Sequence, residues 1–123
     1  MSKTHSVLGS FSHTIDGVKT ALKNEPNLRI HFIAAIATLV FGYYLKLTTL
    51  EFAVVILAIG FVIALELINT SLEALVDIVS PEIRELAKNA KDVAGASVLI
   101  GSLSAAGVAA FVFVPKIMQL LGL

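Results

Sequence analysis

Hydrophobic residues at the start of the chain follow the period of an α-helix. Between residues 6 and 23, apolar side chains recur every three or four positions, and at about 100° per residue they fall within an arc of roughly 100°. They are Val7, Leu8, Phe11, Ile15, Val18 and Leu22. Polar residues fill the rest of each turn, so the segment is too polar to cross a bilayer. The pattern predicts an amphipathic helix over about residues 6–23, lying on a membrane surface or, alternatively, packed on a soluble core.

Longer apolar runs follow, separated by polar breaks. Pro26 is tolerated in the first turn of a helix and disfavours helix at the residue before it, so we expect a new helix near Pro26 with Glu25 in the break. That helix carries the apolar run from Ile30 to Leu45. A second run begins near Leu50, and Ser80-Pro81 should end its helix.

A third apolar run, from Val93 to Val114, contains no ionisable residue. About 20 apolar residues are enough to cross a bilayer core of roughly 30 Å. Small residues are frequent in this run, which indicates close contact between helices, within the chain or between copies. The pattern therefore predicts three membrane spans, over about residues 28–46, 50–79 and 92–119, with residues 81–92 forming a charged connection that has room for a helical turn.

The composition also favours a membrane protein. Hydrophobic residues make up 57% of the chain and charged residues 15%, where soluble domains average about 45–50% and about 25%. The 123 residues suit a single domain, 1–123, and the lack of cysteine excludes disulfides and thiolate chemistry. Nine basic residues balance nine acidic ones without forming a block, so no nucleic-acid surface is indicated.

Basic residues lie mainly on one side of the predicted spans. Only Lys46 and Lys116 fall on the far side; the others are Lys3, Lys19, Lys23, Arg29, Arg84, Lys88 and Lys91. By the positive-inside rule, the amino terminus and the 81–92 connection are cytoplasmic and the carboxyl terminus is outside. The charged end of the second span then faces the cytoplasm.

A polar stripe interrupts the second span. Its residues are spaced by three, four and four, which places them within an arc of roughly 80° on a helix: Glu66, Asn69, Glu73 and Asp77. If the span enters the membrane near Leu50, Glu66 lies roughly 24 Å across and Glu73 roughly 35 Å across. A carboxylate at such depth costs at least ~2.5–3.5 kcal/mol. This cost favours a functional site, although the stripe could also only hydrogen-bond neighbouring helices.

Two kinds of chemistry suit the stripe: transport of an ion or proton, and Mg²⁺-dependent phosphoryl transfer at a membrane surface. Cations and carboxylates follow directly after it, between Glu82 and Asp92. A nucleoside triphosphate needs such cations, whereas a transporter of a single ion does not obviously need them. The chain has neither a GxxxxGK[ST] loop nor a kinase-type glycine loop, so side chains would have to hold the phosphates.

The polar stripe resembles the signature of the integral-membrane prokaryotic diacylglycerol kinase family, which includes undecaprenol kinases. It reads Glu66-Leu-Ile-Asn69-Thr-Ser-Leu-Glu73-Ala-Leu-Val-Asp77, followed by Ala90-Lys91-Asp92. The segment from Asn24 to His31 also looks like the family's stretch ahead of the first span. The resemblance implies an all-α homotrimer in a bacterial cytoplasmic membrane, each chain with a surface helix and three spans. Active sites would form between subunits near the cytoplasmic face.

The resemblance also implies roles for individual residues. Glu66 would be the catalytic base on the lipid hydroxyl, and Asn69 would position the base or the substrate. Glu25 and Glu73 would bind the Mg²⁺ that accompanies ATP. The nucleotide-binding residues would be Glu25, Glu73, Glu82, Arg84, Lys91 and Asp92, with Asp77 in support; Arg29 and His31 would contact the acceptor.

Simpler interpretations exist for some of these residues. Glu25 could be an acid that favours a helix start, and Lys91, Arg29 and His31 could be anchors at the membrane interface. On the family resemblance, we expect an ATP- and Mg²⁺-dependent lipid kinase. Arg29-Ile-His31 looks more like the undecaprenol kinase branch, so undecaprenol is the expected acceptor, with diacylglycerol as the alternative and a small ion or proton transporter as a different class of protein.

Overall fold

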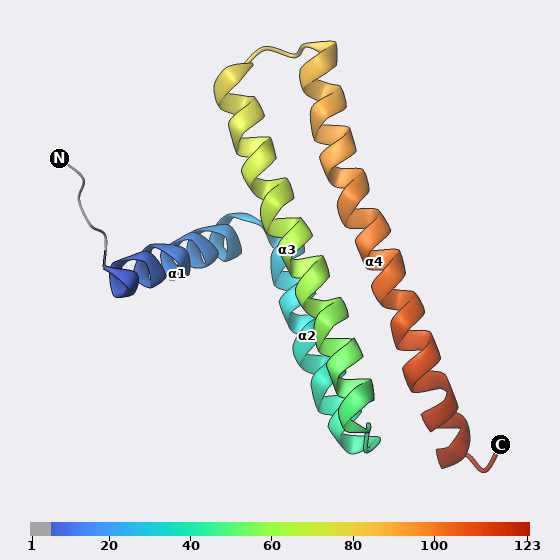
Figure 1. Ribbon diagram of the computed structural model, residues 1–123. Helices are drawn as coiled ribbons and strands as arrows, with labels where there is room; N and C mark the ends of the chain where they lie inside the picture. Colours follow the sequence, from blue (N-terminus) through green and yellow to red (C-terminus); the bar gives the residue numbers. More distant parts are fainter. Residues whose placement is uncertain (1–5) are drawn as a thin grey trace.

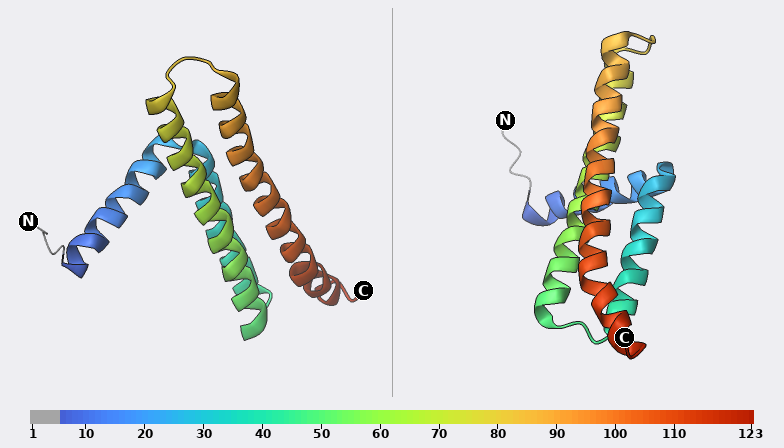
Figure 2. Two further views of the ribbon diagram at one scale, coloured as in Figure 1. Left: turned by 45° about the horizontal axis from the view of Figure 1, so that its top comes forward. Right: turned by 90° about the vertical axis from the view of Figure 1, so that its right-hand side faces the viewer.

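The computed structural model describes residues 6–123, which form four α-helices: α1 (Val7–Asn24), α2 (Pro26–Tyr44), α3 (Thr49–Val79) and α4 (Glu85–Leu120). The all-α prediction is confirmed for this part of the chain; Lys3 lies outside it. α3 and α4 form a long antiparallel hairpin, and α2 packs against α3 (Figure 1). α1 lies across the other helices near the start of α2, so the tip of the hairpin extends beyond it (Figure 2).

Helix boundaries follow local capping chemistry. The Ser6 hydroxyl accepts a hydrogen bond from the Gly9 amide at 3.1 Å and caps α1. Glu25 has extended backbone angles (φ −111°, ψ 105°) and separates α1 from α2, with Pro26 in the first turn of α2. This confirms the predicted break. Ser80 ends α3, also as predicted.

The turn between α2 and α3 is a Schellman motif. Lys46 has a positive φ of 56°, and its amide donates to the Tyr43 carbonyl at 3.1 Å. The Leu47 amide donates to the Gly42 carbonyl at 3.1 Å. A Cβ on Gly42 would lie 3.1 Å from Leu47 Cδ2, so glycine permits the close return of the chain. Thr48 and Glu51 then form a capping box at the start of α3.

The prediction of a charged connection over residues 81–92 is wrong beyond residue 84. α4 begins at Glu85, so the connection covers only residues 80–84. Two features explain the longer helix. Glu85 lies at the positive end of the helix dipole, and Lys88 pairs with Asp92 one turn later at 2.7 Å. Lys91 and Asp92 are therefore held on a regular helix rather than on a loop.

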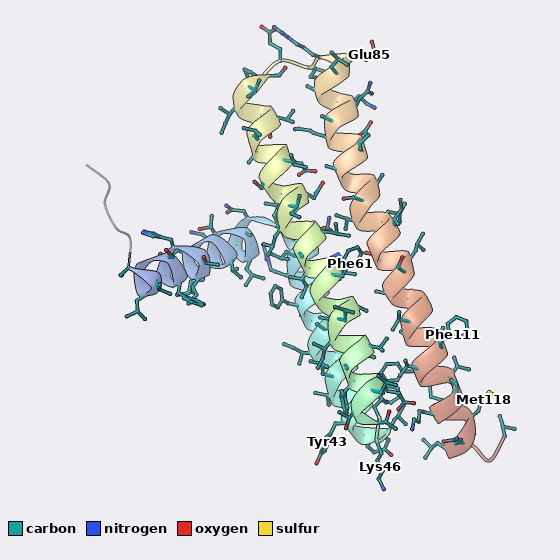
Figure 3. The ribbon with its side chains drawn as sticks, viewed as in Figure 1. Tyr43, Lys46, Phe61, Glu85, Phe111 and Met118 are labelled. Atoms are coloured by element: carbon teal, nitrogen blue, oxygen red, sulfur yellow. The ribbon has the colours of Figure 1, made fainter. Side chains whose placement is uncertain are left out.

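Few side chains are buried within the single chain. A small core lies at the α2–α3 turn and includes Leu45, Leu47, Val55 and Phe113. Most large apolar side chains are exposed, and Phe111 on α4, at 87% exposure, points away from α3 (Figure 3). α3 and α4 are long and apolar enough to cross a membrane. The first two turns of α2 carry polar residues, among them Asn27, Arg29 and His31.

Small residues bring α3 and α4 together. Ala94 and Gly101 are buried, and a Cβ on Gly101 would come within 2.5 Å of Leu65 Cδ1. The predicted close helix contact is therefore confirmed within the chain. Gly95 and Gly107 differ, because no atom of the described chain beyond their own helix lies within 4 Å of a Cβ built there.

Candidate functional site

Glu66 is the one buried charged side chain among residues 6–123, with 2% of its surface exposed. It lies on α3, and the nearest basic group is the imidazole of His31 on α2. His31 Nε2 is 3.9 Å from Glu66 Oε2, within ion-pair range and beyond direct hydrogen-bond range. The predicted base and one predicted acceptor-contacting residue are thus neighbours.

Asn69 and Glu73 follow on the same face of α3. The Asn69 side-chain amide donates a hydrogen bond to Glu73 Oε1 at 3.4 Å. The other end of that side chain, Asn69 Oδ1, is buried and has no hydrogen-bond partner in residues 6–123. A buried acceptor without a partner costs free energy. It therefore has capacity for a donor group on a ligand.

Glu25 approaches the same region from the junction of α1 and α2. Glu25 and Glu73 both lie near enough for their charges to act on Glu66. Within residues 6–123, no three histidine, aspartate or glutamate side chains are close enough to hold a metal ion by themselves. One or two carboxylates nevertheless fit Mg²⁺, which usually keeps several waters and takes further ligands from substrate phosphates.

A second group of charges surrounds a cavity of about 240 Å³ at the tip of the hairpin, near the Glu85 label in Figure 3. The charged residues that line it are Asp77, Glu82, Arg84, Lys88, Lys91 and Asp92. Each cation has an acidic partner: Lys91 pairs with Asp77 across the two helices, Lys88 with Asp92, and Arg84 with Glu82 at 3.5 Å. The hairpin tip is therefore a polar, charged cavity above Glu66.

The ion pairs fix the charge state of the two lysines in this cavity. The hydrogen bond to Asp77 raises the pKa of Lys91, and the hydrogen bond to Asp92 raises the pKa of Lys88. Both lysines precede the apolar segment that starts at Val93. They carry full positive charge at neutral pH, as an anion-binding side chain requires.

A second cavity, also of about 240 Å³, lies between α2, α3 and α4. His31 lines it at the end nearest Glu66. From there it runs towards Thr38, Val55 and Ala109, away from the charged residues. Apart from His31, Thr38 and Ser102 its lining is apolar, with many alanines. Its chemistry suits a hydrocarbon chain rather than a nucleotide.

The sequence profile described as prokaryotic diacylglycerol kinase matches residues 12–113. The chain belongs to this family. It is therefore a membrane-embedded lipid kinase, and the family implies ATP as the phosphoryl donor. The family resemblance of the polar stripe is thereby confirmed.

Named relatives include kinases for two different lipids. The chain is 33% identical to an undecaprenol kinase of Bacillus subtilis over 108 residues, covering 88% of both chains. It is 35% identical to a diacylglycerol kinase of Synechocystis, covering 94% of this chain and 67% of the relative. It is 41% identical to a diacylglycerol kinase of Helicobacter pylori, covering 70% and 67% respectively.

Other expected site residues of this lipid kinase lie apart from Glu66. The Arg29 guanidinium donates to the Lys23 carbonyl at 3.0 Å and is tied to the end of α1. Lys91, Asp92, Glu82 and Arg84 all line the hairpin-tip cavity instead. Sequence reasoning did not include Lys88 in the site, although its spacing of four residues from Asp92 is the signal that would have placed the two on one helix face.

Proposed function

We propose that this lipid kinase transfers the γ-phosphoryl group of ATP to the hydroxyl of undecaprenol, with Mg²⁺ as cofactor. The observation that carries the proposal is the position of Glu66, buried in a membrane helix at the inner end of a polar stripe that leads to a charged cavity. ATP comes from water and the acceptor from the bilayer. Their reacting groups can meet only where polar side chains cross that boundary.

Glu66 is proposed as the general base for the acceptor hydroxyl. A base must lie within hydrogen-bond reach of the proton that it takes, and a lipid hydroxyl can reach the depth of Glu66 from the bilayer. Asn69 lies one turn away, and its free side-chain oxygen can accept a hydrogen bond from a substrate group. Its amide is held by Glu73, which fixes its orientation.

Glu25 and Glu73 are proposed to hold the metal. Both are carboxylates near Glu66, from different elements, and their number fits Mg²⁺ bound to ATP. When bound, Mg²⁺ neutralises charge on the phosphates that are transferred and released. The two glutamates thus define the level of the phosphates, between Glu66 and the hairpin tip.

The hairpin-tip cavity is proposed to bind the rest of the nucleotide. Lys91 would exchange part of its contact with Asp77 for contact with phosphate oxygens. At the rim of the cavity, Arg84 would likewise exchange part of its contact with Glu82. Glu82 and Asp92 accept hydrogen bonds and suit the ribose or the base. Asp77 supports the site by holding Lys91 on the inner face of the hairpin.

The cavity that begins at His31 is proposed to take the hydrocarbon chain of the acceptor. It places that chain next to Glu66 without exposing it to the charged tip. Undecaprenol is preferred because the Arg29-Ile-His31 segment resembles undecaprenol kinases and an undecaprenol kinase is among the relatives. Diacylglycerol is the alternative, because other relatives bear the name of that kinase.

We further propose a homotrimer of single-domain chains, 1–123, with active sites shared between subunits. The exposed Gly95, the half-buried Gly107 with open space beside it, and the many exposed apolar side chains leave surfaces for other copies and for lipid. α2, 19 residues long, spans roughly 28 Å and would be the third transmembrane helix, with α1 on the surface. Of the basic residues in the described chain, only Lys46 and Lys116 lie at the end opposite the hairpin tip. By the positive-inside rule, the amino terminus and the site then face the cytoplasm and the carboxyl terminus is outside.

The test is a lipid kinase assay with the purified protein in detergent micelles. Undecaprenol and diacylglycerol are present in equal amounts with ATP and Mg²⁺, and mass spectrometry identifies the products. We expect undecaprenyl phosphate to form faster than phosphatidic acid. The reverse order would make diacylglycerol the acceptor. No phosphorylated lipid from folded, ATP-binding protein would contradict the proposed function and favour the transporter.

A further inference from the structure

We propose that His31 takes the proton from Glu66 after each phosphoryl transfer and releases it to water. The inference rests on the proposed function, in which Glu66 is the base. A base that has accepted a proton must lose it before the next turnover. Glu66 is 2% exposed, so within this chain it has almost no direct contact with solvent.

His31 is placed to accept that proton. Its Nε2 is 3.9 Å from Glu66 Oε2, and 24% of its side chain is exposed in the single chain. It lies in the polar first two turns of α2, the part of that helix nearest the α1–α2 junction, from which a proton can pass to water. A closing movement of about 1 Å would bring the two atoms into hydrogen-bond range, as catalytic hydrogen bonds often shorten when substrates bind. Histidine is also the side chain whose proton affinity is matched to neutral pH.

Other groups around Glu66 are less suited to this role. Asn69 cannot take up a proton, and the Thr70 hydroxyl donates to the backbone carbonyl of Glu66 at 2.9 Å. Glu25 and Glu73 act on Glu66 by charge, but they are the proposed metal ligands. α4 has no ionisable residue between Val93 and Val114, and the basic residue in the last turn of α1 is Lys23.

The proton balance is simple. The acceptor oxygen forms a bond to the γ-phosphorus while the bond from that phosphorus to ADP breaks, and the hydroxyl proton moves to the Glu66 carboxylate. Glu66 then passes this proton to Nε2 of neutral His31, giving imidazolium and restoring the carboxylate. The imidazolium loses one proton to water. Both side chains return to their starting state, and the net release is one proton per phosphorylated lipid.

Chemical rescue tests the relay. His31→Ala removes the proton acceptor and leaves space beside Glu66, and the expected loss in kcat is about 10²-fold or more. Added imidazole should restore turnover, with a rate that rises with the fraction of neutral imidazole as the pH increases. His31→Gln keeps a polar side chain that cannot carry the proton, so it should stay impaired. Ile33→Ala, on an exposed face of α2, is the control and should neither lose activity nor respond to imidazole.

Several results would overturn the relay. They are wild-type kcat with an unchanged pH profile in His31→Ala, full activity in His31→Gln, or loss of activity in both variants without rescue. Glu66→Gln separates this inference from the proposed function. If Glu66→Gln is inactive while His31→Ala behaves as the wild type, only the relay is wrong. If Glu66→Gln turns over normally, the proposed base is wrong as well.

Discussion

The two ends of the α3–α4 hairpin both carry lysine–carboxylate pairs, but the pairs lie in different surroundings. At the end near the α2–α3 turn, Lys116 and Glu51 are 3.3 Å apart and only 21% and 29% exposed, next to the small apolar core. At the tip, Lys91 and Asp77 are 37% and 63% exposed and line an open cavity. The Lys116–Glu51 pair lies beside packed apolar side chains. The Lys91–Asp77 pair is more exposed, so its charges are accessible from the cavity.

The carboxylates and lysines of the two pairs also differ in their other contacts. Glu51 also accepts a hydrogen bond from the Thr48 amide at 2.7 Å, so its carboxylate is committed to the helix cap as well as to Lys116. Lys91 takes no part in a helix cap; it pairs with Asp77, and the charge of Glu73 also acts on it. An exposed pair contributes little to stability, and this pair lines a cavity, which is the basis of the proposal that Lys91 binds nucleotide.

Replacement of Glu73, which lies on α3 between Glu66 and the hairpin tip, should weaken the response to Mg²⁺. Glu73→Gln removes a proposed metal ligand, and we expect the Mg²⁺ concentration for half-maximal activity to rise by roughly 10–100-fold. The measurement is a Mg²⁺ titration of lipid phosphorylation at fixed ATP. Glu51→Gln is the matched control, because it changes the same side chain on the same helix at the far end. An unchanged Mg²⁺ dependence in Glu73→Gln would remove Glu73 from the metal site.

Lys91→Gln should have an effect of similar size on the use of ATP. Loss of a charge-assisted contact to phosphate costs about 1.5–3 kcal/mol, so the KM for ATP should rise by roughly 10–100-fold while the KM for the lipid stays near its wild-type value. Steady-state kinetics with each substrate varied in turn would show this. In Lys116→Gln, the matched control, activity should stay within about twofold. Equal effects of the two lysine variants on ATP would contradict the distinction between the ends.

In thermal unfolding, Lys116→Gln should have a larger effect than Lys91→Gln, and both effects should be smaller than those on catalysis. Lys116→Gln breaks a half-buried pair beside the core, so it should lower the midpoint of unfolding in detergent. Lys91→Gln breaks an exposed pair and should leave the midpoint nearly unchanged. The measurement compares both variants with the wild type without ATP or lipid. A larger loss of stability in Lys91→Gln would make the tip pair structural.

Much of the fold could be predicted from local signals. The predicted bounds of α1, α2 and α3 lie close to the observed ones. They rest on the apolar periodicity, on the proline at residue 26 and on the Ser80-Pro81 stop. The start of α4 was missed because residues 85–92 are mostly charged, and their helix depends on pairs such as Lys88–Asp92 that only a helix can form. Composition alone cannot separate such a helix from a charged loop.

The sequence predicted which site residues share one helix face, but not which residues of different helices meet. Spacing placed Glu66, Asn69 and Glu73 on one face of a helix, and the hydrogen bond between Asn69 and Glu73 agrees with it. The contact of His31 with Glu66 and the pair of Lys91 with Asp77 join different helices. These contacts depend on how α2 and α4 rotate and pack against α3, which no local pattern encodes.

The central claim is that Glu66 acts on the acceptor while the hairpin tip binds the nucleotide. The most direct test measures Mg²⁺–ATP binding and lipid turnover in the same preparation of Glu66→Gln. The prediction is a kcat lower by about 10²-fold or more, with a Kd for Mg²⁺–ATP equal to that of the wild type. Wild-type turnover, or loss of ATP binding by a folded variant, would contradict the claim.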